Sequence, residues 1–468
     1  MIKTKRLAIG LAGLALAACA VSCSGNGDDL PYVPETETVP PTYELETEYH
    51  PDYEQMLDTA FGQVAPAPAS SFTFEDCDGG VRILSCTDVQ SEYIKIPEAI
   101  DGKQVVAIGD GAFSACTAMT ALDIPASVTE FGKGILEGCK KLNTLRTPAF
   151  RDADGKMFVG YLFGADSSDR NATAVPAALE NLILLSCPEQ VDKGIFYRCK
   201  NLVFVALPEG VREIDDFAFA NCESLAYLHL PAGLARIGDY AFLDCLELFT
   251  LQVPSSVTEM GRGMLEGCAK VADLTLPFVG GTQSENTYLG YLFGAAHYEF
   301  SKGYMPLSLA EITVNGSLTA LPDNAFFECA TLCRVNLPDT LTSVGLRAFY
   351  GCERLGQITL PDGVTAIGDE AFYGCIRLKR AELGSSLTSL GIQSFYGCLS
   401  LEQIALPDTL TTVSRSAFAK CQSLCTLTFS GVTKIEKNAF LGCIALTSVP
   451  SLDGVTVEDG NDALNTRN

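Results

Sequence analysis

The sequence predicts a solenoid, in which short coils of chain stack in one direction and each coil buries its apolar side chains against its neighbours. The first observation is a cysteine at nearly constant spacing, since eight of the eleven steps between consecutive members are 23 residues long. This cysteine column consists of Cys116, Cys139, Cys199, Cys222, Cys245, Cys268, Cys329, Cys352, Cys375, Cys398, Cys421 and Cys443. The second is a large apolar residue three positions before each of these cysteines, which we call the plug; it is phenylalanine in ten coils and leucine, at Leu136 and Leu265, in two. The sequence therefore predicts about 12 coils of 23 residues.

The coil that begins at Cys352 illustrates the elements expected in each repeat. Leu355 and Ile358 lie in a short apolar stretch that ends at Pro361, and such a stretch, closed by proline, is typical of a strand. Two further apolar positions after the proline predict a short extended piece. The step Ala371-Phe372 then suits one tight helical turn.

The stretch from Cys352 to Cys375 reads CERLGQITLPDGVTAIGDEAFYGC. It resembles, almost position by position, the repeat of BspA-like bacterial leucine-rich-repeat proteins, and the resemblance runs from about Phe72 to Pro450. It implies a leucine-rich-repeat solenoid with a short strand and a short helical turn per coil, and adhesion to host or bacterial partners. Since such solenoids carry many unrelated binding roles, the resemblance is more specific for fold than for function.

The cysteine column is expected to form a ladder of reduced, buried side chains inside the solenoid. Free cysteine is among the most buried residue types, and parallel side chains on stacked coils fit disulfide geometry poorly. Neither a paired-cysteine spacing nor a nearby histidine recurs, so we expect no metal and no cofactor. The sequence leaves open whether the cysteines outside the column are paired or free: Cys77, Cys86, Cys187, Cys333 and Cys425.

Residues 1–18 have the layout of a secretory signal, in which three basic residues precede an apolar run of twelve that is too short to span a bilayer. The run ends in Leu-Ala-Ala-Cys19, which resembles the lipobox of bacterial lipoproteins. Cys23 fits a looser lipobox and would extend the signal to residue 22. The resemblance implies that Cys19 or Cys23 carries a lipid that anchors the mature chain to the cell envelope, at the surface of the outer membrane.

Residues 19–70 are predicted to be an acidic, proline-rich tether, because residues 24–70 contain ten acidic residues and no lysine or arginine. Part of it, near Tyr53 to Phe61, has the pattern of a short helix. The solenoid is predicted over residues 71–450, and a hairpin at its start, with a turn at Asp78-Gly79-Gly80, is expected to cap the first coil. Residues 451–468 are predicted to be a C-terminal tail.

Two steps of the cysteine column are long, at 60 and 61 residues, and predict insertions at about 149–185 and 278–313. Both insertions contain the hexapeptide GYLFGA, around Tyr161 and Tyr291. Two interpretations remain open. Either the hexapeptide packs a structural side lobe onto the solenoid, or the insertions form a recognition surface, because insertions in solenoids tend to fall on one face.

The composition argues against enzyme chemistry and against polyanionic partners. The chain has only three histidines, His50, His229 and His297, which lie far apart in the sequence and suggest no general base or metal cluster. The formal net charge is −25 at pH 7, so we expect no nucleic-acid partner and no membrane contact other than the lipid.

A row of aromatic residues is the best candidate for a binding site. Tyr350, Tyr373 and Tyr396 occupy the position directly after the plug in three consecutive coils, and Phe327 occupies it one coil earlier. Aromatic side chains with a polar tip are favoured at recognition surfaces, although each ring could instead lie over the turn of its own neighbouring coil.

These observations predict a non-catalytic, lipid-anchored surface protein that binds partners, with adhesion or protein–protein interaction as the leading hypothesis. The alternative is a glycan-capture lipoprotein that serves nutrient uptake. The absence of tryptophan counts against the alternative, because tryptophan is the best ring for sugar and cation stacking. The ligand is therefore expected to be a protein or a glycan on host or neighbouring cells.

Overall fold

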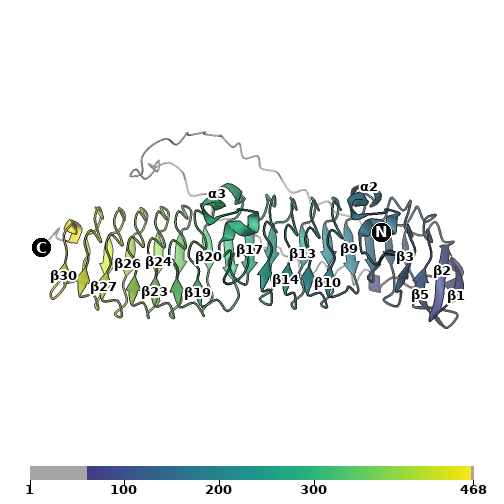
Figure 1. Cartoon of the computed structure of the whole chain (residues 1–468), viewed down its shortest axis with the longest axis horizontal. Coiled ribbons are helices and arrows are strands. Elements are labelled where there is room, and N and C mark those ends of the chain that lie inside the picture. The colour runs from purple at the N-terminus through teal and green to yellow at the C-terminus, as the bar shows by residue number, and fades with distance from the viewer. Residues whose placement is uncertain (1–60, 465–468) are drawn as a thin grey trace. The chain divides into compact units, whose positions relative to one another are not determined.

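The computed structural model describes residues 61–464, which form a β-solenoid of about 16 turns at a spacing of ~23 residues. Successive turns lie side by side along one axis (Figure 1). The predicted fold class is confirmed. The number of turns exceeds the predicted 12 because turns also form at the cap and within the segments expected to be insertions.

The first wall of the solenoid consists of short parallel strands, one from each turn. Val205 lies opposite Leu228 in neighbouring strands, so the buried middle residues form continuous apolar columns. The strands of this wall are β3 (Tyr93–Lys95), β6 (Ala121–Asp123), β8 (Thr144–Thr147), β9 (Asn181–Leu184), β11 (Phe204–Ala206), β13 (Tyr227–His229), β15 (Thr250–Gln252), β17 (Asp273–Leu276), β18 (Glu311–Val314), β20 (Arg334–Asn336), β22 (Gln357–Thr359), β24 (Arg380–Glu382), β26 (Gln403–Ala405) and β28 (Thr426–Thr428).

The second wall consists of two-residue parallel strands that follow the proline turns. Its strands are β7 (Glu130–Phe131), β10 (Gln190–Val191), β12 (Glu213–Ile214), β14 (Arg236–Ile237), β16 (Glu259–Met260), β19 (Ala320–Leu321), β21 (Ser343–Val344), β23 (Ala366–Ile367), β25 (Ser389–Leu390), β27 (Thr412–Val413), β29 (Lys434–Ile435) and β30 (Thr456–Val457). These strands match the short extended piece predicted for each repeat.

The third side of each regular coil is a hydrogen-bonded turn and not the helical turn that the sequence predicted. The reason is a residue two positions before the plug that has a positive φ in all twelve coils of the cysteine column, such as Arg347 at 53° and Glu370 at 55°. A left-handed residue cannot continue a right-handed helix. Alternate N–H groups instead donate to the next coil, as in the bond from Phe219 N to Ala241 O at 2.8 Å.

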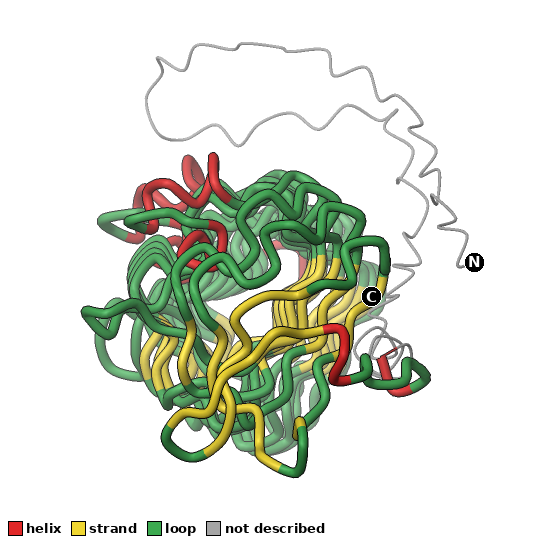
Figure 2. The backbone as a smooth tube through the Cα atoms, turned by 90° about the vertical axis from the view of Figure 1, so that its right-hand side faces the viewer, coloured by secondary structure: helices red, strands yellow, loops and turns green. Residues whose placement is uncertain are grey.

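Helices among the described residues lie in the insertion segments and near the two ends of the described chain. They are η1 (Ala69–Ser71), η2 (Val159–Phe163), η3 (Ser168–Arg170), α2 (Asn171–Ala174), η4 (Leu289–Phe293), η5 (Tyr298–Phe300), α3 (Ser301–Tyr304) and η6 (Asp462–Leu464). Phe61 and Gly62, the first described residues, are also helical. The helices of both insertion segments lie on the same side of the solenoid (Figures 1 and 2).

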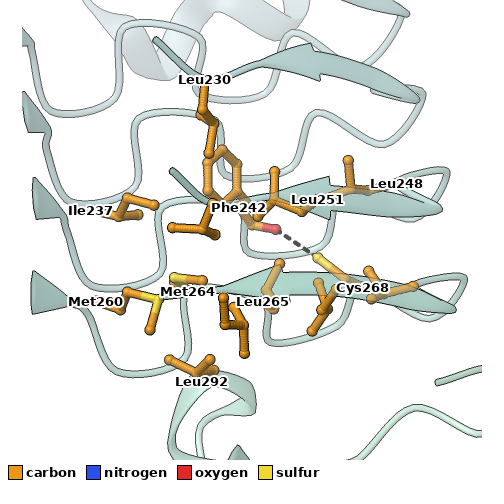
Figure 3. Close-up of a cluster of buried hydrophobic side chains, with 14 of the residues drawn as sticks. Leu230, Ile237, Phe242, Leu248, Leu251, Met260, Met264, Leu265, Cys268 and Leu292 are labelled. Carbon is orange, nitrogen blue, oxygen red and sulfur yellow. Dashed lines mark hydrogen bonds between the residues drawn. The ribbon is translucent and has the colours of Figure 1, made fainter. Parts of the chain in front are cut away.

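The core is a stack of plug rings beside a ladder of thiols. The rings of Phe349 and Phe372 are parallel, with centroids 4.9 Å apart. In nine of the twelve coils the ladder cysteine donates its S–H to the plug carbonyl of the preceding coil. Figure 3 shows this bond from Cys268 to Phe242, at 3.1 Å.

All seventeen described cysteines are free thiols, and the twelve ladder members are buried, which confirms that the cysteine column lies inside the solenoid. Burial raises the pKa of the Cys139 thiol to about 11 and that of Cys268 to about 12. These thiols therefore stay neutral at physiological pH and act as small apolar side chains with one weak donor.

The predicted N-terminal hairpin is confirmed. Strand β1 (Phe72–Cys77) pairs with β2 (Gly80–Cys86) in antiparallel fashion, and β2 pairs in parallel with β5 (Lys103–Ile108), which is also joined by β4 (Ala99–Ile100). The hairpin thus covers the open edge of the first turn.

The predicted boundaries of the tether and the tail need correction. Residues 61–70, expected in the tether, include η1, and Phe61 is buried against the first wall. Within the expected tail, β30 continues the second wall, and the buried Asn461 accepts a hydrogen bond from Phe440 N at 3.0 Å. The Asn461 side chain takes the place of the next coil's carbonyl, so this segment closes the solenoid.

Candidate functional site

The aromatic row predicted from the sequence forms a continuous stack on the solenoid. The ring centroids of Phe327 and Tyr350 are 5.0 Å apart, those of Tyr350 and Tyr373 are 4.8 Å apart, and those of Tyr373 and Tyr396 are 4.8 Å apart. The rings are parallel within 9°. All four side chains are half-buried, and burial raises the pKa of the Tyr350 hydroxyl.

The outer faces of the two end rings are also in contact with other side chains. The Lys420 ammonium lies 5.3 Å from the ring centroid of Tyr396. At the other end, Tyr298 of η5 meets Phe327 edge-to-face, with centroids 5.1 Å apart. Because neighbours cover the ring faces, what the stack offers to a partner is its ring edges.

Tyr298 joins the row to an exposed aromatic group on the second insertion segment, which sequence analysis did not identify. His297 packs on Tyr298 at a centroid distance of 4.3 Å, and Phe300 and Tyr304 are 59% and 47% exposed. We call the row together with Tyr298 the aromatic band, and its members are Tyr298, Phe327, Tyr350, Tyr373 and Tyr396. The 23-residue periodicity could not predict the added member, because Tyr298 lies outside the repeat register.

The two GYLFGA hexapeptides pack into the solenoid, as the structural interpretation predicted, but they form part of its wall and not a side lobe. They form η2 and η4, which replace the plug turn, and Leu136 N donates to Leu162 O at 2.8 Å as regular coils do to their neighbours. Strands β9 and β18 also lie within the expected insertions and continue the first wall. Each insertion is therefore a long coil, in which only the segment after the hexapeptide projects.

Tyr161 and Tyr291, predicted as alternative ligand contacts, lie at equivalent places but differ in exposure. Tyr161 is buried, and its hydroxyl donates to Phe131 O at 3.0 Å, so the structure gives it a packing role. Tyr291 is half-buried. The Tyr291 ring meets that of Tyr288 edge-to-face, with centroids 6.1 Å apart.

A buried asparagine holds the first hexapeptide in place and was missed by sequence analysis. The Asn171 side chain accepts from Gly160 N at 2.8 Å and donates to Ile195 O and Tyr197 O at 3.2 and 2.9 Å. The second copy has Ser301 at the equivalent position, which is also buried. A single asparagine outside any repeat column gives no sequence signal of this role.

A groove of about 800 Å³ lies between the first insertion segment and the adjoining coils. Buried Phe158 and half-buried Phe217 are among its apolar residues, and Asp169 and Asp192 contribute carboxylates. Arg151 pairs with Asp192 at 3.2 Å across the groove. The volume is in the range of small-ligand sites, but seven of the fifteen lining residues are charged, whereas such sites are lined mainly by apolar side chains.

Within residues 61–464, no group of three or more His, Cys, Asp or Glu side chains is arranged to hold a metal ion. His229 lies in β13 and His297 precedes η5, whereas His50 lies outside the described residues. The predicted lipid anchors, Cys19 and Cys23, also lie outside them. In the described part of the chain no helix is sufficiently long and apolar to cross a membrane.

Comparison with known proteins identifies the repeats. A family model described as "BspA type Leucine rich repeat region" matches in six copies, over residues 86–159, 176–288, 300–361 and 344–459. A search of curated proteins gave no match.

Solved structures similar to the chain include a leucine-rich repeat protein from Bacteroides ovatus and a leucine-rich cell surface protein from Faecalibacterium prausnitzii. The first is 22% identical, with 77% of this chain and 98% of that chain covered and a TM-score of 0.38. The second is 23% identical, with 86% of this chain and 97% of that chain covered and a TM-score of 0.33.

Proposed function

Since the chain belongs to the family of BspA-type leucine-rich-repeat proteins, we propose that it is a non-catalytic binding protein of the cell envelope that holds a protein partner on the aromatic band. The observation that carries the proposal is the stack of Phe327, Tyr350, Tyr373 and Tyr396, with centroids 4.8 to 5.0 Å apart. Stacked rings are fixed before binding, so a partner meets a rigid aromatic surface and little side-chain freedom is lost.

A protein partner fits this surface better than a glycan. Sugars and cations bind aromatic side chains mainly through the ring face, and each internal ring face of the row is covered by its neighbour. Ring edges and exposed aromatic side chains, such as Phe300 beside the band, suit the apolar and polar atoms of a protein surface.

The proposal places the protein at the outer-membrane surface, anchored by a lipid on Cys19 or Cys23. The support is the N-terminal sequence, in which basic residues and a twelve-residue apolar run precede a lipobox-like Leu-Ala-Ala-Cys. The formal charge of −25 opposes direct contact with anionic lipid, so the lipid, and not the protein surface, would hold the chain to the membrane.

The experiment that tests the proposal is to probe parallel protein and glycan arrays with the purified chain. Saturable binding to a protein, lost when Tyr350, Tyr373 and Tyr396 are replaced, is expected. Saturable binding to glycans alone, unchanged by those replacements, would refute it.

Glycan capture is the second candidate function, and the groove beside the first insertion segment is the observation that favours it. Carboxylates such as Asp169 accept hydrogen bonds from hydroxyl groups, and Phe217 adds an apolar surface at the groove. Glycan binding that is lost on Phe217→Ala and retained in the tyrosine variants would select this alternative.

A further inference from the structure

The outward face of the first wall changes character along the solenoid. On strands β20, β22 and β24 the outward residues are polar: Arg334, Asn336, Gln357, Thr359, Arg380 and Glu382. On β6 to β13 several are apolar and form a cluster that we call the outer patch: Ala121, Ile183, Phe204, Ala206 and the half-buried Tyr227. An apolar patch on one stretch of an otherwise polar face indicates that another segment or partner packs over it and shields it from water.

Phe61 belongs to this cluster. Its side chain is buried to the same degree as those of the patch: Phe61 and Ile183 are 5% exposed and Phe204 is 4% exposed. Phe61 comes from the N-terminal side of the solenoid and not from the wall itself. The chain therefore returns over the outer face of its own first wall before it enters the first coil.

Two hydrogen bonds to Lys95 fix the direction of this segment. Ala67 N donates to Lys95 O at 2.8 Å, and Lys95 Nζ donates to Phe61 O at 3.4 Å. Lys95 belongs to β3, at one end of the sheet order β13-β11-β9-β8-β6-β3, whereas Phe61 packs with residues of β6, β9 and β11. Followed backwards from residue 67 to residue 61, the chain thus moves from β3 towards β11 and β13.

The sequence upstream has the pattern needed to continue over the patch. Tyr53, Met56, Leu57, Ala60 and Phe61 stand at positions i, i+3, i+4, i+7 and i+8, which is the apolar stripe of an amphipathic helix. The residues between them are charged or polar: Glu54, Gln55, Asp58 and Thr59.

The length of this segment also matches the patch. A helix of nine residues is about 12 Å from first to last Cα, at about 1.5 Å per residue. The distance from β9 to β13 is about 10 Å, because neighbouring strands are about 4.8 Å apart.

We propose that residues 53–61 dock on the outer patch as an amphipathic helix, with Tyr53, Met56, Leu57, Ala60 and Phe61 against Ile183, Phe204 and Tyr227. Residues 53–60 lie outside the described part of the chain, so the proposal rests on their sequence pattern and on the position of Phe61. Docking moves the point where the tether leaves the solenoid from the cap to strands β9–β13.

The absence of tryptophan from the chain provides a direct test, because an introduced tryptophan is the sole indole reporter. Met56→Trp and Leu57→Trp, each in the full chain, place the reporter on the apolar stripe, and Asp58→Trp is the matched control on the opposite side. The first two are expected to show blue-shifted emission and a several-fold smaller acrylamide quenching constant than the control. Equal quenching of all three variants would overturn the proposal.

A second replacement tests the outer patch itself. Adding Phe204→Ser to Leu57→Trp should raise quenching to the level of the Asp58→Trp control, while circular dichroism shows that the solenoid remains folded. Tyr227→Ser, at a half-exposed position, serves the same purpose if Phe204→Ser impairs folding. Protection that survives both replacements, or that appears only at high protein concentration and so indicates a second copy as the occupant, would contradict docking within one chain.

Discussion

Replacing Cys245 by alanine is expected to lower the free energy of unfolding by about 1–2 kcal/mol without changing binding. The thiol is fully buried, so its removal leaves a small cavity, and burying one methylene-sized group contributes about 0.8 kcal/mol. The S–H donates to Phe219 O at 3.3 Å, but this oxygen also accepts from Cys222 N at 3.1 Å and is not left without a partner. The lost thiol bond therefore adds only a few tenths of a kcal/mol to the cavity cost.

The assay is a urea titration followed by circular dichroism, with two matched variants. Cys329→Ala removes an equally buried thiol that follows an insertion coil. Its S–H donates only a longer bond, to Phe327 O at 3.8 Å, so its cost should lie close to the cavity cost. Cys425→Ala removes an exposed thiol and should change stability by less than about 0.5 kcal/mol. If Cys245→Ala and Cys425→Ala behave alike, the ladder does not pack as described. Mass spectrometry that finds the ladder cysteines in disulfides would refute the same reasoning.

Three further predictions concern the anchor, the thiols and the first insertion segment. Replacing both Cys19 and Cys23 by serine should release the protein from the membrane fraction, and continued sedimentation with membranes would mean that another group anchors it. Because burial raises the pKa of Cys139 from 9.0 to about 11, the folded state holds this proton more tightly. The raised pKa stabilises the folded state fully below about pH 9, and this stabilisation is lost as the pH rises towards 11. The urea midpoint should therefore fall between about pH 9 and pH 11, and a midpoint that stays level would contradict this. Asn171→Ala removes three hydrogen bonds, two of them buried and one partly buried, and should cost about 2–4 kcal/mol, more than Ser301→Ala in the second copy; equal costs in urea titrations would contradict the assigned role.

Much of the fold follows from the sequence because stacking forces equivalent residues into register. The plug and ladder columns each have to match the coil above and below, so their spacing is visible without a structure. The turn on the third side was predicted wrongly as helical. Its left-handed residue is glycine in some coils but Arg347 or Glu370 in others, and these residue types do not signal a positive φ.

The candidate site was predictable only in the part that follows the period. Tyr350, Tyr373 and Tyr396 are 23 residues apart, and their stacking follows from the register. The contact of Tyr298 with Phe327 depends on how a non-repeating segment folds back onto the solenoid, which no local pattern specifies. The packing of Phe61 on the outer patch is a long-range contact of the same kind.

Loss of the stacked rings also affects stability, and a test of binding needs a control for this. Parallel aromatic pairs contribute about 0.5–1.5 kcal/mol each beyond their buried area. Tyr240, which stacks on Phe217 at 5.2 Å on earlier coils, offers a control, because Tyr240→Ala removes a stack away from the aromatic band and leaves the groove residue Phe217 in place.

The role of the aromatic band is tested most directly by the affinity of the triple variant Tyr350→Ala, Tyr373→Ala, Tyr396→Ala for the protein partner found on the array, measured beside the Tyr240→Ala control. Truncation of one hot-spot residue costs about 2 kcal/mol or more, which is about 30-fold in Kd, so the triple variant should show no detectable binding. The control should bind as the unaltered chain does. A folded triple variant that keeps full affinity would contradict the assignment of the aromatic band as the binding surface.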